Sequence, residues 1–184
     1  MSTAAMIILI VAIVAVAAVC FYLIWRQQRS KNLRTHFGPE YDEAVREFGN
    51  REKAEHALVG RQKRMEKVKI QPLTTAERDR FADQWVQVQS KFVDDPAGSI
   101  HEADQLVCDA MRARGYPMAD FDRRAEDLSV EHPQVVKNYR AAHDIAMRSD
   151  RKEATTEELR RGLVYYRDLF DELLEMHISS GTRR

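Results

Sequence analysis

The sequence predicts an all-α protein: a single N-terminal transmembrane helix followed by an irregular bundle of about five or six helices. Three observations lead to this prediction. An apolar run without charge, Gly or Pro occupies residues 4–25. Beyond it Gly and Pro are scarce, whereas Ala, Glu, Arg and Leu, which favour helices, are abundant. Apolar residues there recur at helical spacing rather than in the alternation of a half-buried strand.

The run at 4–25, AAMIILIVAIVAVAAVCFYLIW, has the length of a transmembrane helix. A helix rises about 1.5 Å per residue, so the run extends over roughly 30 Å, the thickness of the hydrocarbon core. A cleaved signal peptide would place basic residues before a shorter apolar stretch, but residues 1–3 contain no Lys or Arg. A lipoprotein signal is also a poor match, because Val19 precedes Cys20 and apolar residues follow. We therefore expect a retained anchor at 1–25.

The charges that follow the anchor predict its orientation. Residues 26–37 form a basic juxtamembrane segment, so the positive-inside rule leaves the N-terminus outside and the helical domain in the cytoplasm. The protein is thus expected as a single-pass component of the inner or plasma membrane. Its membrane-interface residues would be Tyr22, Trp25, Arg26, Arg29, Lys31 and Arg34, and the lipid bilayer its first partner.

The distribution of charge narrows the possible partners. The formal net charge is zero, yet residues 26–69 carry 12 basic against seven acidic side chains, and residues 70–184 carry 17 against 22. A basic segment beside the anchor suits an anionic leaflet, whereas an acidic distal part argues against a nucleic-acid partner. The two cysteines, Cys20 in the anchor and Cys108 in the domain, are not expected to pair, in agreement with a reducing compartment.

The soluble domain is expected at 38–176. Pro39 suits the first position of a helix through PEYDEAVREF, which Gly49 ends. Asn50 caps a charged helix at 51–69, whose apolar face is interrupted by Arg61. We expect this helix to lie against the core, or alternatively on the membrane surface.

Capping signals delimit the next two helices. Thr74 and Glu77 form a capping box before the strongest apolar stripe of the domain, and Asp95 with Pro96 starts a helix that ends at Gly115. A short helix is expected at 120–128, the next begins within SVEHP at 129–133 and runs to about Arg148, and a second capping box at Thr155 begins the last one. A disordered tail is expected at 177–184. The predicted core contains Phe81, Trp85, Val88, Phe92, Ile100, Val107, Val136, Tyr139, Leu163, Phe170 and Leu173.

One histidine pair is the sharpest candidate for chemistry. His132, Tyr139 and His143 share a predicted apolar face and make a candidate pocket. The two histidines are separated by roughly 16 Å along a helix, so one metal ion would need ligands from other helices. Histidines that are buried and hydrogen-bonded are the simpler interpretation. Paired-cysteine zinc spacings, Glu-x-x-His pairs, phosphate-binding glycine loops and a Gly-x-Ser-x-Gly elbow are all missing from the sequence, so no enzyme activity and no cofactor are expected.

A connection between helices offers a candidate surface for a protein partner. Arg114 and Tyr116 in RGYP, with Phe121 close behind, place aromatic and basic side chains in or beside a loop. Such residues often anchor partners. The alternative is that they close the end of the bundle and pack on its core.

Several stretches together resemble a family. The stretches that resemble an uncharacterised bacterial family are FGPEYD at 37–42, TAERDRF…W…VQ…FVDDP at 75–96, EADQLV at 102–107, RGYP at 114–117 and SVEHPQVVKNYRAAH at 129–143. Its members are short, with one N-terminal hydrophobic segment and a helical domain, and carry labels such as hypothetical, membrane or secreted protein. The resemblance implies this architecture and brings no activity.

The sequence therefore predicts a membrane-tethered, non-enzymatic helical module, an adaptor or scaffold that presents its surface to another protein. Tethering raises the local concentration of such a module, so weak contacts suffice. The alternative function is a ligand- or metal-responsive sensor, or an enzyme, with a pocket near His132 and His143.

Overall fold

This computed structural model describes residues 3–175, apart from the side chains of 3–12, 14, 15 and 19. In this range the chain is all-helical, with eight helices and no strand. The helices are α1 (Thr3–Phe37), α2 (Pro39–Phe48), α3 (Arg51–Met65), α4 (Thr75–Lys91), α5 (Pro96–Arg114), α6 (Phe121–Glu131), α7 (Val136–Asp150) and α8 (Thr156–Leu173). The tail predicted at 177–184 lies outside the described residues.

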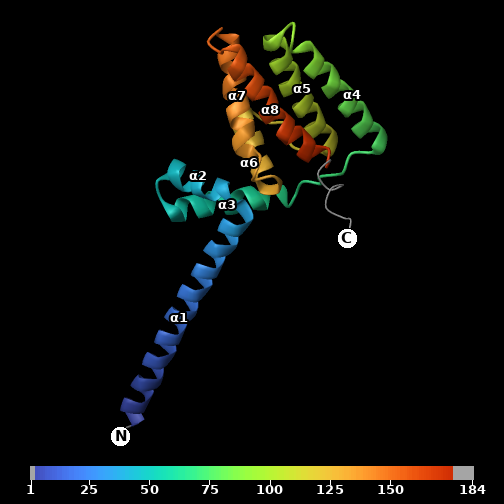
Figure 1. The fold of residues 1–184 in the computed structure, drawn as a ribbon. Helices are drawn as coiled ribbons and strands as arrows, with labels where there is room; N and C mark the ends of the chain where they lie inside the picture. The colour runs from blue at the N-terminus through green and yellow to red at the C-terminus, as the bar shows by residue number, and fades with distance from the viewer. Residues whose placement is uncertain (1–2, 176–184) are drawn as a thin grey trace, which may run out of the picture.

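Helix α1 projects away from the rest of the molecule, and α2 and α3 lie across its C-terminal end (Figure 1). It is 35 residues long, so the basic segment at 26–37 continues the same helix rather than forming a separate connection. Among the residues that the structure describes, no helix combines the length and the apolarity needed to cross a membrane.

The C-terminal part of α1, from residue 26 on, together with α2 and α3, makes a small unit that we call the collar. Its apolar core consists of Leu33, Phe37, Tyr41, Ala44, Ala54 and Leu58, all buried. This second core was not predicted from the sequence. Leu33 and Phe37 fall in a segment whose charges suggested only a juxtamembrane role.

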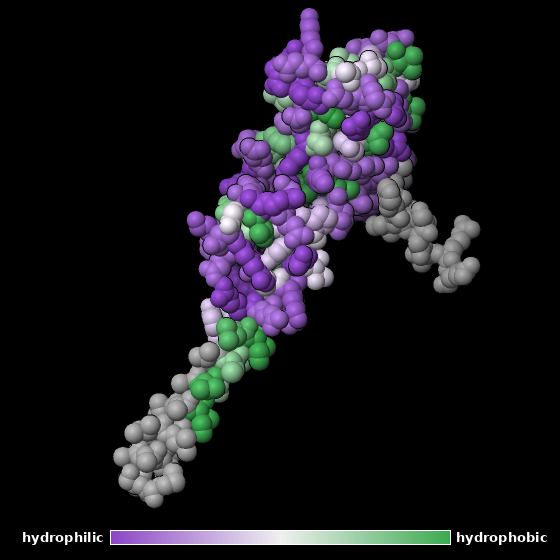
Figure 2. Space-filling view, turned by 60° about the vertical axis from the view of Figure 1, so that its left-hand side comes forward, coloured by the Kyte–Doolittle hydropathy of each residue, from purple (hydrophilic) through white to green (hydrophobic). Residues whose placement is uncertain are grey.

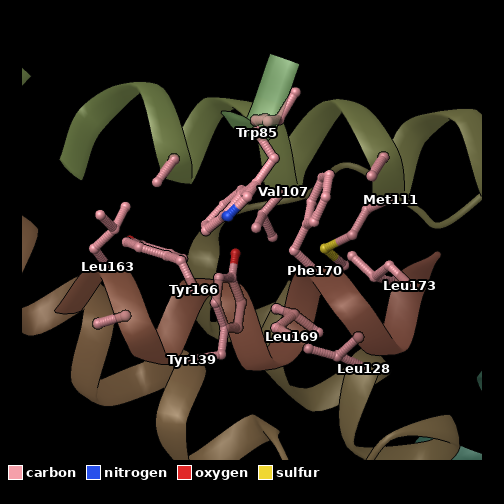
Figure 3. Packing of buried hydrophobic residues seen from close by; sticks show 14 of the residues in the cluster. Trp85, Val107, Met111, Leu128, Tyr139, Leu163, Tyr166, Leu169, Phe170 and Leu173 are labelled. Atoms are coloured by element: carbon pink, nitrogen blue, oxygen red, sulfur yellow. The ribbon is translucent and has the colours of Figure 1, made fainter. Parts of the chain in front are cut away.

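Helices α4 to α8 make a second unit, the bundle, in which α8 packs between α5 and α7 and α4 covers α5 (Figure 1). Ten of the eleven predicted core residues are buried, and Phe92 is half-buried. Trp85 of α4 stacks on Phe170 of α8 with ring centroids 4.8 Å apart, among the aliphatic side chains of Figure 3. Aromatic and aliphatic burial of this kind is the main source of stability in a helical bundle.

The predicted capping signals are confirmed. Both Thr74 and Thr155 accept a hydrogen bond from the backbone N–H of the glutamate three residues on, whose carboxylate returns a contact to the cap. Asp95 caps α5, and Asn50 caps α3. Because these side chains satisfy backbone N–H groups that would otherwise lack partners, the sequence locates these helix starts accurately.

Three details differ from the predictions. The charged helix expected at 51–69 ends at Met65. Seven helices follow α1 within the described residues, rather than about five or six, because each of the seven stretches delimited in the sequence forms a helix of its own. The boundary between α6 and α7 also moves. The N–H of His132 donates to the carbonyl of Leu128 at 2.8 Å, so α6 continues to Glu131, and α7 begins only at Val136. Pro133 forces this break, since it disfavours helical backbone at the residue before it.

Candidate functional site

The predicted membrane-interface residues lie on one exposed stretch of α1, which begins in the apolar run and continues into the collar. Tyr22 and Trp25 are 55% and 52% exposed, and Figure 2 shows apolar surface here beside the mostly hydrophilic rest. The neighbouring cations differ in their contacts. Arg26 pairs with Glu52, whereas the Arg29 guanidinium lies over the Trp25 ring, 5.6 Å from its centroid.

The two other predicted cations of this stretch also lie at the surface. Arg34 lies 3.4 Å from Asp42 of α2, and Lys31 is exposed. Exposed pairs such as this one contribute little to stability. The basic face of α1 is therefore available to a ligand or to the surface of a membrane, but it does not hold the collar together.

A buried serine of α1 fixes the collar instead. Ser30 is 3% exposed and donates a short hydrogen bond to the carboxylate of Glu55, which also accepts from Tyr41 at 2.8 Å and from Arg51 at 2.9 Å. Burial opposes ionisation of Glu55, but these three donors outweigh it and lower the pKa of its carboxyl group. The cluster joins α1, α2 and α3 by directional contacts, which set the angle at which α1 leaves the domain.

The collar meets the bundle at a buried ionic site. Glu40 of α2 is 3% exposed and accepts from Arg61 of α3 at 2.6 Å and from both terminal nitrogens of Arg140 of α7, at 2.6 and 2.8 Å. Burial lowers the pKa of Arg140, but the hydrogen bonds and charge of Glu40 raise it further. One carboxylate thus clamps two guanidinium groups from two units.

Acidic residues of α6 complete this site, which we call the junction. Arg61 is 2% exposed; its Nη2 lies 3.6 Å from the carboxylate of Glu126, and its Nη1 donates to Ser129 at 3.4 Å. Arg64, one turn on, contacts Glu126 at 2.7 Å and Asp127 at 3.2 Å. Each arginine of the junction faces a carboxylate of another helix, so these contacts favour one relative position of the collar and the bundle.

The structure separates the surroundings of the predicted histidine pair. His143 stacks on Phe121 with ring centroids 3.6 Å apart, and Phe121 also contacts Tyr139 at 5.0 Å. His132 ends α6 instead, with Nδ1 3.4 Å from a carboxylate oxygen of Glu172. Tyr139 and His143 therefore share an aromatic neighbour, while His132 has different ones.

Burial dominates the electrostatics of these side chains. It lowers the pKa of both histidines, reinforced for His132 by the positive charge of Arg114, and it raises the pKa of Tyr139. One ring nitrogen of each histidine is buried without a hydrogen-bond partner among the described residues. Within those residues no three His, Cys, Asp or Glu side chains are grouped as ligands of a metal ion. Burial also raises the pKa of the Cys108 thiol, which makes it a poorer nucleophile.

The predicted partner surface around Arg114, Tyr116 and Phe121 is not exposed. Arg114 and Tyr116 are 6% and 3% exposed, and Phe121 is half-buried against the core. The Arg114 guanidinium donates to the carbonyl of Leu173 at 2.9 Å, where it satisfies the C-terminal end of α8. These residues close the end of the bundle, which was the alternative interpretation.

Sequence analysis missed the junction as a site. Arg61 gave a signal, since a charged residue interrupted an apolar helix face, but its partner Glu40 lies in the first turn of α2, where an acidic residue is common and points to no partner. Glu40 and Arg140 are 100 residues apart in the chain. No local pattern reports a contact over that separation.

Comparisons with known proteins do not place the chain in a family. No family model matches the sequence, and neither the curated proteins nor the solved structures contain a match.

Proposed function

We propose that the protein is a membrane-tethered, non-enzymatic helical module that holds its bundle at a fixed orientation close to the cytoplasmic face of a membrane, for contact with another protein. The single observation that carries this proposal is the continuity of α1. One helix contains the uncharged run at 4–25 and ends with Leu33 and Phe37 buried in the collar. A tether of this kind transmits orientation, which a flexible linker does not.

Exposed apolar side chains support the tether. Phe21 is 72% exposed and Ile24 66% exposed, and both belong to the apolar run. Contiguous apolar surface of this kind is costly in water and marks contact with a membrane or with another protein. The basic residues that follow favour the cytoplasmic orientation. The resemblance to short membrane-anchored helical proteins agrees with this proposal.

The first test of the proposal is extraction and topology of the full chain. The wild-type protein should stay in the membrane pellet after alkaline carbonate treatment. A fluorescent protein fused after Arg184 should fluoresce, while alkaline phosphatase at the same place should be inactive. An active phosphatase fusion would overturn the proposed orientation, and carbonate extraction of the wild type would overturn the tether.

A pair of matched variants sharpens this test. Lysines at Ile13 and Val16, near the middle of the run, should release the chain, because each costs about 2.5–3.5 kcal/mol at the centre of a transmembrane helix. Lysines at Val86 and Val93 add the same charge to exposed positions of the bundle, 62% and 84% exposed, and should leave the chain in the pellet. Equal release by both pairs would show that added charge alone is responsible.

The role as an interaction module has its own test. A photo-crosslinking residue placed in turn at exposed positions of α4, α7 and α8, including Val86, Met147 and Val164, should give one stoichiometric adduct in cells. Adducts that arise from one face of the bundle would support the module. No adduct from any position would overturn it.

The pocket near His132 and His143 remains the second candidate, as a ligand- or metal-responsive sensor or an enzyme. It is supported by the two buried ring nitrogens without partners among the described residues. Metal analysis of the purified chain, with thermal melting in the presence of divalent cations, tests it. A melting shift that is lost in His143→Ala would support this candidate, and unchanged melting would remove it.

A further inference from the structure

A groove lies between α1 and α3, directly after the apolar run. Its volume is about 560 Å³, and Leu33 of α1 with Val59 of α3 gives it apolar surface. Trp25 lines the end nearest the run, and Gln62 lines it from α3. The groove therefore begins at the last exposed apolar ring of α1 and continues between two helices of the collar.

The end of the groove nearest Trp25 lies at the depth of lipid headgroups if 4–25 spans the bilayer, whereas its far end, lined by His36, is roughly 16 Å farther along α1. The polar layer of one leaflet is roughly 5–8 Å thick, given the difference between the whole bilayer and its hydrocarbon core. Arg29 follows Trp25 by one helical turn, which is roughly 6 Å along α1. Trp25 and Arg29 thus bracket the layer in which lipid phosphates lie.

Arg29 is the one arginine or lysine of this stretch of α1 that both lines the groove and lacks a carboxylate partner among the described residues; Lys31 also lacks one but does not line the groove. Arg26 and Arg34 have carboxylate partners, Glu52 and Asp42, whereas within the described residues Arg29 has no carboxylate within 4.0 Å. It lines the groove with its guanidinium over the Trp25 ring. A guanidinium without an anionic partner is a preferred group for binding phosphate.

Neutral donors surround this charge. The side-chain amides of Gln28 and Asn32 line the groove on α1, and that of Gln62 faces it from α3. Amides donate hydrogen bonds to ester and hydroxyl oxygens without adding charge. The groove thus combines the Arg29 guanidinium, the imidazole of His36, several neutral donors and the apolar surface of Trp25, Leu33 and Val59, which suits an amphiphile.

We propose that this groove binds one anionic phospholipid of the leaflet in which α1 ends. Arg29 binds the lipid phosphate, the amides contact the polar headgroup, and the acyl chains lie along the apolar surface that ends at Trp25. This inference rests on the proposed membrane tether. A bound lipid would fix the depth of the collar as well as its orientation.

The experiment measures lipid binding to the full chain in detergent micelles by native mass spectrometry. Short-chain phosphatidylglycerol is the probe, phosphatidylcholine the neutral comparison, and glycerol 3-phosphate the free headgroup. Wild-type protein should bind phosphatidylglycerol in preference to phosphatidylcholine, with little competition from glycerol 3-phosphate. Equal binding of the two lipids, or equimolar displacement by glycerol 3-phosphate, would overturn the proposal.

Variants test whether the groove is the binding site. Arg29→Gln should weaken phosphatidylglycerol binding about ten-fold, because a charge-assisted contact is lost, and Gln62→Ala about three-fold. Lys31→Gln is the matched control. It removes one positive charge, as Arg29→Gln does, but Lys31 lies two residues farther along α1 and does not line this groove. It should change binding by less than about two-fold. Equal loss in Arg29→Gln and Lys31→Gln would overturn the site.

Carbonate extraction of the same proteins separates this inference from the proposed function. If the chain stays in the membrane pellet but binds both lipids equally, the proposed lipid site is wrong and the proposed membrane tether stands. If carbonate extracts the chain, the proposed membrane tether is wrong, and so is the lipid site that rests on it.

Discussion

The helices of the collar and those of the bundle are held together by different kinds of contact. The bundle has a large continuous core of aromatic and aliphatic side chains, drawn mainly from α4 to α8, to which Met65 of α3 and Leu73 of the following connection also belong. The collar has a core of six buried residues, and adds the Ser30 cluster and the junction around Glu40. Packing holds the first unit, and directional polar contacts hold much of the second.

The two kinds of contact are expected to have different effects, one on the stability of the fold and the other on the angle between α1 and the bundle. Apolar contacts are non-directional, so they stabilise a bundle without selecting one exact angle. A buried carboxylate bound by two guanidinium groups is satisfied in one geometry and is costly in others. We infer that the bundle provides most of the free energy of unfolding, whereas the polar clusters set the direction in which α1 leaves the domain.

The largest expected effect is in the bundle. Trp85→Ala removes a ring that is 1% exposed and stacked on Phe170, so the free energy of unfolding should fall by about 4 kcal/mol. Urea unfolding of the full chain in micelles, followed by circular dichroism, measures this change. Trp85→Phe keeps a ring at the position and should lose less than about 1.5 kcal/mol. A loss below about 1 kcal/mol in Trp85→Ala would mean that the core repacks easily.

The junction should show the next largest effect. Glu40→Gln keeps the shape of the side chain but leaves Arg61 and Arg140 without their shared anion, at a cost of about 3 kcal/mol. Unfolding measures the cost, and spin labels on α1 and α7 should report a broader range of distances. Replacing the core tryptophan should not broaden this range before unfolding. This contrast tests whether the junction sets the orientation of α1 while the core of the bundle sets the free energy of unfolding.

Two further variants control this prediction. Asp42→Asn removes an exposed acid from the same helix and should cost less than about 0.5 kcal/mol. Combining Glu40→Gln with Arg61→Met should recover part of the loss, because one of the unpaired cations is removed. If Glu40→Gln behaves like Asp42→Asn, the buried ions do not hold the two units together.

The two units also differ in how well the sequence predicts them. The partner of a cap such as Thr155 lies three residues away, and the apolar residues of a stripe such as that of Trp85 recur every three or four residues. Both are local patterns, and these features were predicted correctly. The clamp on Glu40 joins residues 21 and 100 positions away, and its charges resemble those of any solvated helix face. Leu33 and Phe37 were missed because the basic residues around them obscured an apolar face. Contacts between residues close in the chain can therefore be predicted from the sequence, whereas ion pairs between residues far apart in the chain cannot.

A smaller effect is expected at the start of α8. Thr155→Ala removes the side chain that accepts from the N–H of Glu158 at 3.3 Å, and should cost about 1 kcal/mol. Thermal melting of the full chain measures the change. Thr156→Ala, one residue inside the helix, removes the same hydroxyl and methyl groups without affecting the cap, so its melting should stay near wild type. Equal losses from both would show that the capping box contributes nothing.

The smallest expected effect is a pH dependence at His132. Burial and the charge of Arg114 lower the pKa of His132 in the folded state, against the opposing carboxylates of Glu172 and Glu131. Below about pH 6.5 the unfolded chain therefore binds a proton that the folded chain resists, so stability is complete above this pH and falls as the pH is lowered toward 5. Unfolding in urea at pH 5 to 7.5 should show a shallower slope in His132→Gln. His56→Gln, at an exposed position of α3, is the control for the substitution itself. An unchanged slope in His132→Gln would assign the acid sensitivity elsewhere, with His143, also lowered in pKa by burial, as the next group to replace.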